Sequence, residues 1–330
     1  MSNKKEAYLC LSAMLRAREP RLLNNERAER MLDAPNFEEA AKLFTDCGYA
    51  DMSQMSANEI EAELAAHRRA VFQELEQFCP DKELVDVFRM KYDYHNVKVI
   101  IKAEAMGLEP QRLLSASGRI EPERLLALYN EDKLIELPGT FASAVEEAKS
   151  VLARSSNPQL ADFVLDKAYF TELRSAADKT GCAFLKGYAE ILIDAANLKS
   201  AVRTIRMGKA AGFLEEVIIP GGGVSAESII SAGDRDGITA LFAHSGLDKA
   251  AALGNETAEG GTMTAFELAC DNAVNSYLKS AKLAGYGPEP VVAYIAAVEG
   301  EITAARMILT GRLSGIKPEV IRERLRDLYA

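Results

Sequence analysis

The feature that most constrains this chain is a motif that returns with a period of about a hundred residues. Asp93 to Lys98 reads DYHNVK and Asp194 to Lys199 reads DAANLK, and the two acids lie 101 residues apart. A third acid, Glu299, follows 105 residues later in a similar apolar tract. A cluster that recurs at a fixed period is typical of a repeated fold, in which each unit carries one copy.

A second marker keeps the same register. Asp166 begins DKAYFTEL and Asp271 begins DNAVNSYL, 105 residues apart. Each of these acids stands 28 residues before the acid of the following tract. Two independent markers with one spacing favour true structural repeats over chance similarity.

A third marker is a short entry into a helix. It combines an acid with Pro, Ser or Ala in the first helical turn, where fixed backbone angles and negative charge are both favourable. Copies are GRIEPERLLAL from Gly118, GGVSAESIISA from Gly222, SGIKPEVIRERL from Ser314, and an earlier one, LLNNERAERMLDA from Leu22. Four entries against three long tracts indicate that the chain starts part-way through a unit.

The long tracts predict the fold class. They span residues 81–106, 181–207 and 290–309 and are apolar on more than one face, which is typical of helices surrounded by protein. We therefore predict an all-α fold of three homologous helical bundles, arranged as a funnel with pseudo-threefold symmetry. The predicted units are residues 1–112, 113–217 and 218–330, with the chain start packing on the chain end. Solenoid repeats of about 34 to 47 residues are too short to explain this period.

Composition excludes several classes of partner. The net charge of −10 argues against nucleic-acid binding, which needs a surplus of basic residues. The five cysteines never form a CxxC pair, which suits a reducing cytoplasm. The longest apolar run has about eight residues, against roughly 20 for a membrane span, so we expect any membrane role to be peripheral.

Local motifs of catalysis and metal binding are missing. Residues three before His67, His95 and His244 are not acids, which excludes paired Glu-x-x-His ligands. The only Gly-Lys pair, at Gly208, lacks the remainder of a phosphate-binding loop. PGGGVS from Pro220 could form an anion-binding nest, but its place at a repeat junction favours a linker. We therefore predict no catalytic residue, no cofactor and no metal.

The repeated polar residues need a structural explanation, because a buried carboxylate is costly unless it is bonded or paired. We expect each acid to clamp a neighbouring helix entry or to pair with a basic residue such as Arg203 or Arg306; direct contact with a partner is the alternative. The set comprises Asp93, Asn96, Asp166, Asp194, Asn197, Asp271 and Glu299.

The whole chain resembles the C subunit of V/A-type ATPases, the family that includes the d subunit of the eukaryotic V-ATPase. The resemblance rests on YLCLSAMLRAREPRLL from Tyr8, DYHNVKVIIKAEAMG from Asp93, DKAYFTELRSAA from Asp166, DAANLKSAVRTIRMG from Asp194 and GRLSGIKPEVI from Gly311. It departs from the repeat pattern where Glu299-Gly-Glu-Ile302 replaces the acid and amide pair, and where the longer PGGG junction stands.

This resemblance implies a non-catalytic subunit on the cytoplasmic, inner face of the cell membrane, one copy per complex. It implies a socket that receives the central shaft of the ATPase, sits on the membrane rotor ring and couples rotation to proton or sodium movement. For a polar foot on the ring we predict arginines near the long-helix ends: Arg16, Arg18, Arg21, Arg203, Arg206, Arg306 and Arg312. The alternatives are a helical scaffold of another complex, or an enzyme with an inter-domain site.

Overall fold

The computed structural model describes residues 5–209, 212–232 and 234–330. Within these ranges every regular element is a helix and there is no strand, so the predicted all-α class is confirmed. The α-helices are α2 (Leu9–Arg18), α3 (Asn25–Asp33), α4 (Phe37–Phe44), α5 (Ala57–Phe78), α6 (Glu83–Met106), α7 (Pro122–Asn130), α8 (Gly139–Ser155), α9 (Pro158–Thr180), α10 (Ala183–Arg206), α11 (Gly212–Val217), α12 (Ala226–Ala232), α13 (Arg235–Phe242), α14 (Asp248–Ala258), α15 (Met263–Lys279), α16 (Pro288–Leu313) and α17 (Pro318–Arg322).

Short 3₁₀ turns complete the set of elements. They are η1 (Glu19–Arg21), η2 (Thr45–Cys47), η3 (Gln111–Leu113), η4 (Leu134–Glu136) and η5 (Ser280–Leu283). The boundaries of the α-helices have local causes. Ser56 and Glu59 form a reciprocal capping box at the start of α5. Gly107, in the left-handed conformation, ends α6 and lets the amide of Leu108 bond back to Ala103.

The three long helices predicted from the sequence are α6, α10 and α16. They are buried over much of their surface because other helices cover more than one side of each. In α16 the run from Val291 to Val298 is buried at every position. Such a helix cannot be stable alone in water, and its apolar surface drives the packing of its neighbours.

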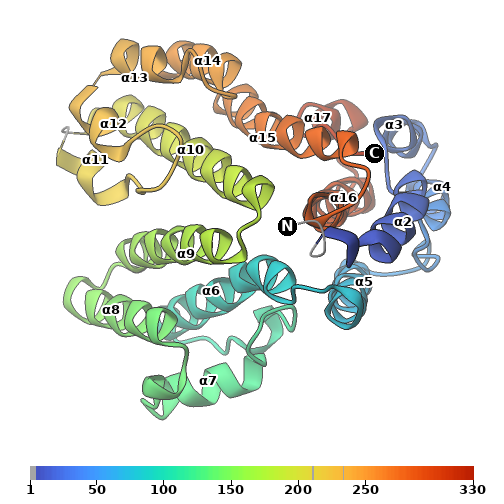
Figure 1. Cartoon of the computed structure of the whole chain (residues 1–330), viewed down its shortest axis with the longest axis horizontal. Coiled ribbons are helices and arrows are strands. Elements are labelled where there is room, and N and C mark those ends of the chain that lie inside the picture. Colours follow the sequence, from blue (N-terminus) through green and yellow to red (C-terminus); the bar gives the residue numbers. More distant parts are fainter. Residues whose placement is uncertain (1–4, 210–211, 233) are drawn as a thin grey trace.

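Each long helix packs against its own group of shorter helices. In Figure 1, α6 lies with α7, α8 and α9, and α10 lies with the group that ends in α14 and α15. For α16 the partners come from the other end of the chain, namely α2, α3, α4 and α5. The chain start and the chain end therefore pack together. The boundaries after residues 112 and 217 stay a prediction.

Polar contacts tie the two chain ends to each other. Lys5 pairs with Glu289 at 3.1 Å, and the hydroxyl of Ser12 receives the amide proton of Gly287 at 3.2 Å. Arg322 of α17 pairs with Glu29 and Asp33 of α3. Non-covalent contacts thus close the helix group around α16, since its two parts lie far apart along the chain.

Candidate functional site

The first repeated acid, Asp93, lies on α6 and is completely buried. One carboxylate oxygen accepts the backbone amides of Arg119 at 2.9 Å and Ile120 at 3.2 Å, and the other accepts Nε of Arg119 at 2.6 Å. Burial raises the pKa of Asp93, while the hydrogen bonds and the charge of Arg119 oppose that rise. Asp93 therefore holds the loop that leads into α7, as expected for a clamp on a helix entry.

The amide in the motif acts on the same loop. Asn96 exchanges two hydrogen bonds with the backbone of Ser115, at 2.9 Å and 2.7 Å. A side-chain amide can satisfy one donor and one acceptor of a chain segment in this way. Gly118 explains the sequence of the loop, because a Cβ at this position would collide with the carboxylate of Asp93. Acid, amide and glycine form one device.

The second copy of the device is on α10. Asp194 accepts the backbone amides of Gly223 and Val224, each at 3.1 Å, and Asn197 exchanges two hydrogen bonds with the backbone of Ile219. A Cβ at Gly222 would collide with the carboxylate. The glycine-rich junction is thus a cradle of amides around a carboxylate from the same chain. Burial raises the pKa of Asp194 to about 6, because only backbone amides oppose it.

The third clamp is made by Glu301 on α16, not by Glu299. Glu301 is 2% exposed and accepts the amide of Leu23 at 2.5 Å and the hydroxyl of Tyr49 at 2.7 Å. Leu23 belongs to the earliest helix entry in the sequence, so α16 clamps the start of the chain. Burial raises the pKa of Glu301 to about 7. The amide position is lost, since Ala304 stands three residues after the acid.

Glu299 has a different role from the one its spacing predicts. It accepts Nζ of Lys91 at 2.6 Å and the hydroxyl of Tyr92, both from α6, and lies 3.1 Å from Nε of Arg68 on α5. Burial works to raise the pKa of Glu299, but Lys91 and Arg68 together hold it below its usual range. Glu299 therefore stays ionised and links α16 to α5 and α6.

A second repeated contact was not predicted from the sequence. The residue five positions after each clamping acid is a cation, and it pairs with an acid on another helix of the same group. Lys98 pairs with Asp166 at 2.5 Å, Lys199 pairs with Asp271, and Arg306 forms a two-bond pair with Glu61 at 2.6 Å and 2.7 Å. This explains why Asp166 and Asp271 keep register with the long helices. The spacing of acid and cation would also have identified Glu301.

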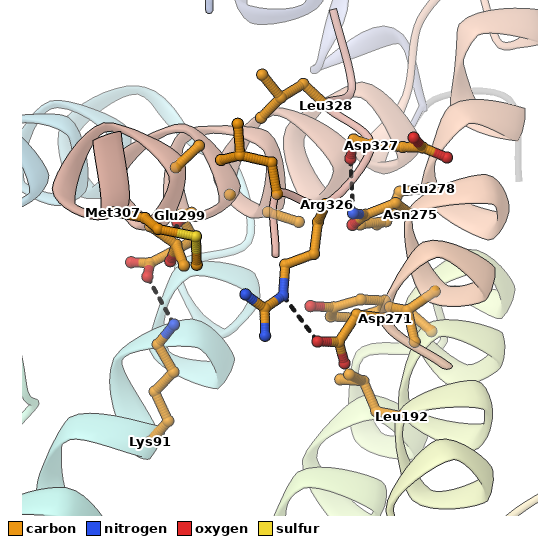
Figure 2. Close-up of a pocket in the computed structure, with 17 residues that line it drawn as sticks. Lys91, Leu192, Asp271, Asn275, Leu278, Glu299, Met307, Arg326, Asp327 and Leu328 are labelled. Carbon is orange, nitrogen blue, oxygen red and sulfur yellow. Dashed lines mark hydrogen bonds and ion pairs between the residues drawn. The ribbon is translucent and has the colours of Figure 1, made fainter. Parts of the chain in front are cut away.

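A cavity of about 270 Å³ lies where α15 and α16 meet the last residues of the chain. Figure 2 shows Arg326 extending into it toward α15, where its Nε lies 2.7 Å from Asp271. Asn275 donates to the carbonyl of Asp327, and the Lys91 pair with Glu299 lies on the opposite wall. Asp271 therefore bonds both Lys199 and the chain end. The polar residues named here that line the cavity are thus bonded to other residues of the chain.

Most of the predicted interface arginines are already bonded within the chain. Arg16 donates to the carbonyls of Ala281 and Ala284, and Arg18 pairs with Glu74 at 2.6 Å. Partners of the others are Glu267 for Arg203, Thr257 and Gly261 for Arg206, Glu61 for Arg306 and Ala34 for Arg312. Arg203 and Arg306 therefore do not pair with the clamping acids. Arg21 is exposed and has no such contact among the described residues.

The arrangement of these groups does not resemble a reaction centre. Asp93, Asp194 and Glu301 each bind backbone amides of a different helix entry, so they do not converge on one pocket. His67 stacks on Tyr49 with a ring separation of 4.0 Å, and burial lowers its pKa. Across the described residues, no group of three or more His, Cys, Asp or Glu side chains could hold a metal ion. In the same part of the chain, no helix is long and apolar enough to span a membrane.

Known proteins resemble this chain along nearly its whole length. It is 25% identical to the C subunit of the V-type sodium ATPase of Enterococcus hirae, covering 98% of this chain and 99% of that protein. It is 26% identical to the C subunit of the A-type ATP synthase of Methanocaldococcus jannaschii, covering 97% and 86%. It is 24% identical to the C subunit of the A-type ATP synthase of Pyrococcus horikoshii, over 98% of this chain and 92% of that protein.

The resemblance inferred from the sequence motifs is therefore confirmed. The profile of the ATP synthase (C/AC39) subunit family matches residues 11–324, which include the three clamping acids and all three long helices. A match of this extent leaves no room for a separate catalytic domain within the chain. The chain belongs to the ATP synthase (C/AC39) subunit family, whose members are structural subunits of V-type and A-type ATPases.

Proposed function

We propose that this protein is a central-stalk subunit of a V/A-type ATPase. It would act as a socket between the central shaft and the membrane rotor ring, carry torque between them and take no part in catalysis. The observation that carries the proposal is the family match over residues 11–324, which leaves only short ends unmatched. The relatives are named as C subunits of a sodium ATPase and of A-type ATP synthases, and the complex of this chain would move protons or sodium ions.

The architecture supports a role in carrying force. A part that transmits torque must resist deformation, and packed helices resist it better than loops. Each long helix fixes one helix entry through a buried carboxylate and is joined to a neighbouring helix by an ion pair. We propose that these three groups of helices are equivalent units of a funnel with pseudo-threefold symmetry.

The packing suggests how the chain is divided among these units. The first would contain α6 to α9, the second α10 to α15, and the third α16 with α2 to α5. This division differs from the units predicted from the sequence, 1–112, 113–217 and 218–330, because each unit now begins with a long helix. The third unit then takes its helices from both ends of the chain.

Contacts with the shaft and the ring are part of the same proposal. The chain would be present in one copy per complex on the inner face of the membrane, with a polar foot that includes the seven arginines. Arg21, which is exposed, would be available without breaking a contact inside the chain. The other six would have to share or exchange their present partners.

Co-purification from detergent-solubilised membranes tests this function. An affinity-tagged copy of the full chain should bring down the shaft and ring subunits of the ATPase, and the purified chain should hydrolyse no ATP by itself. A matched sample carrying the tag alone controls for adhesion to membranes. Recovery of a folded chain with neither shaft nor ring subunits would contradict the proposal and would favour a scaffold of another complex.

A further inference from the structure

The three carboxylate clamps differ in what compensates their charge. Asp93 has two backbone amides and the guanidinium of Arg119, while Asp194 has two backbone amides. Glu301 has a single backbone amide and a phenol hydroxyl. Asp194 and Glu301 thus have two donors each and no paired cation, but Glu301 is the more deeply buried, at 2% exposed against 6% for Asp194. Since burial without a paired cation disfavours the ionised carboxylate, the clamp on α16 is the one most sensitive to ionisation.

The charged and titratable groups around Glu301 do not supply a direct counter-ion. Arg27 of α3 faces it, but this guanidinium donates to the carbonyls of Pro20 and Leu22. Cys47 of η2 and Tyr294 of α16 are also close, and neither carries positive charge. Behind Tyr49 lies His67 of α5, whose pKa is lowered because burial favours the neutral imidazole. Arg18, which lies near Tyr294, is paired with Glu74, and Arg68 and Lys91 are paired with Glu299.

The position of this clamp gives it a special consequence. In the other two groups the clamped loop is covalently continuous with its long helix, through residues 107–118 and 208–222. In the third group the clamped residue, Leu23, lies 278 positions from Glu301 along the chain. If the clamp releases, no short connection holds the entry of α3 against α16.

We propose that the helix group formed by the two chain ends is a pH-sensitive closure, which loosens above neutral pH when Glu301 ionises and releases the segment from Leu23 to Tyr49. The inference does not depend on the proposed function, since it follows from the contacts of Glu301 alone.

The direction of the effect follows from proton linkage. Glu301 has a pKa of about 7 in the closed group and an ordinary pKa once water reaches it, so the closed form binds more protons between these values. The stability that this group contributes is present at low pH and is lost as pH rises through about 7. Between pH 6 and pH 8.5 the equilibrium for opening should shift by about tenfold toward the open form.

Thiol labelling can measure this opening in the full-length protein. Cys47 is buried beside Glu301, while Cys270 is buried on α15 in the second helix group, and burial raises the pKa of both thiols to about 12. Cys270 therefore corrects for the pH dependence of the labelling reaction itself. Iodoacetamide labelling under native conditions, read for each cysteine by mass spectrometry, should give a ratio of Cys47 to Cys270 rates that rises about tenfold from pH 6 to pH 8.5.

Two variants make the test specific. Glu301→Gln keeps an acceptor for Leu23 and a polar contact to Tyr49 but cannot ionise, so its labelling ratio should stay constant with pH. Asp194→Asn removes another buried carboxylate of raised pKa, in a different clamp, and should leave the rise intact. A constant ratio in the unmodified protein, or the same rise in Glu301→Gln, would overturn the proposal.

Discussion

At the residue scale, the molecule uses one device three times: a buried acid on a long helix that accepts backbone amides from a helix entry. The acids and amides on α6 and α10 could be found from the sequence, because their spacing is kept and their neighbours are apolar. The third acid could not be found from the hundred-residue period, although the cation five residues after it, Arg306, marks it. Its repeat is longer, the amide is replaced by Ala304, and a second acid, Glu299, stands two residues before it.

The negative charge of Asp93 is compensated by Arg119, whereas that of Asp194 is not paired with a cation, so substitution of the two acids should lower stability by different amounts. Asp93→Asn removes the buried partner of Arg119, which keeps only its pair with Glu172, and should lower the free energy of unfolding by about 2 kcal/mol. Asp194→Asn removes one hydrogen bond and no ion pair, and should cost about 1 kcal/mol. Urea denaturation at pH 7 measures both. Equal losses would show that the guanidinium contributes nothing to the clamp on α6.

The glycine at a clamp is a second prediction at this scale. Gly222→Ala places a methyl group against the carboxylate of Asp194, so we expect a loss of about 2 kcal/mol from forced displacement. Gly139→Ala, at the start of α8, meets no atom within 4 Å and serves as the matched control. The two variants are compared by thermal unfolding. A Gly222→Ala protein as stable as the control would show that the loop can move without loosening the clamp.

At the element scale, the long helices were predictable because apolar residues cover more than one face of each, whereas their neighbours were harder to delimit. The helices α11, α12 and α13 have only 6, 7 and 8 residues. Helices this short depend on tertiary packing, so propensity alone does not define them. The ion pairs between helices were missed for another reason. A cation five residues after an acid points to a different face of the helix. Only the fold shows that an acid of another helix lies opposite this cation.

The pair between α16 and α5 allows a direct test of this pairing. Arg306→Glu places two acids opposite each other and should lower stability by about 1 kcal/mol, because both side chains are partly exposed and screened. The double variant Arg306→Glu with Glu61→Arg should recover most of this loss. Chemical denaturation of the four proteins in a double-mutant cycle gives the coupling. No recovery in the double variant would mean that the two side chains do not interact in solution.

At the scale of the whole molecule, the sequence predicted three repeats and the packing of chain start on chain end, but not how the last group is completed. The covalent order hides this, since Leu23 and Glu301 are 278 residues apart and neither stands in a recognisable motif with the other. The same holds for the chain end, which lines the cavity on α15 through Arg326. Contacts of such long range depend on the closed arrangement of all the helices.

The most direct test of the account is to assemble the ATPase with and without this chain. If the chain couples shaft and ring, its removal should leave ATP hydrolysis by the head intact while ATP-driven ion transport into reconstituted vesicles is lost, and adding back the purified chain should restore transport. Adding back the Gly139→Ala variant, which disturbs no neighbouring atom, should restore it equally well. Unchanged ion transport in complexes that lack the chain would contradict the account.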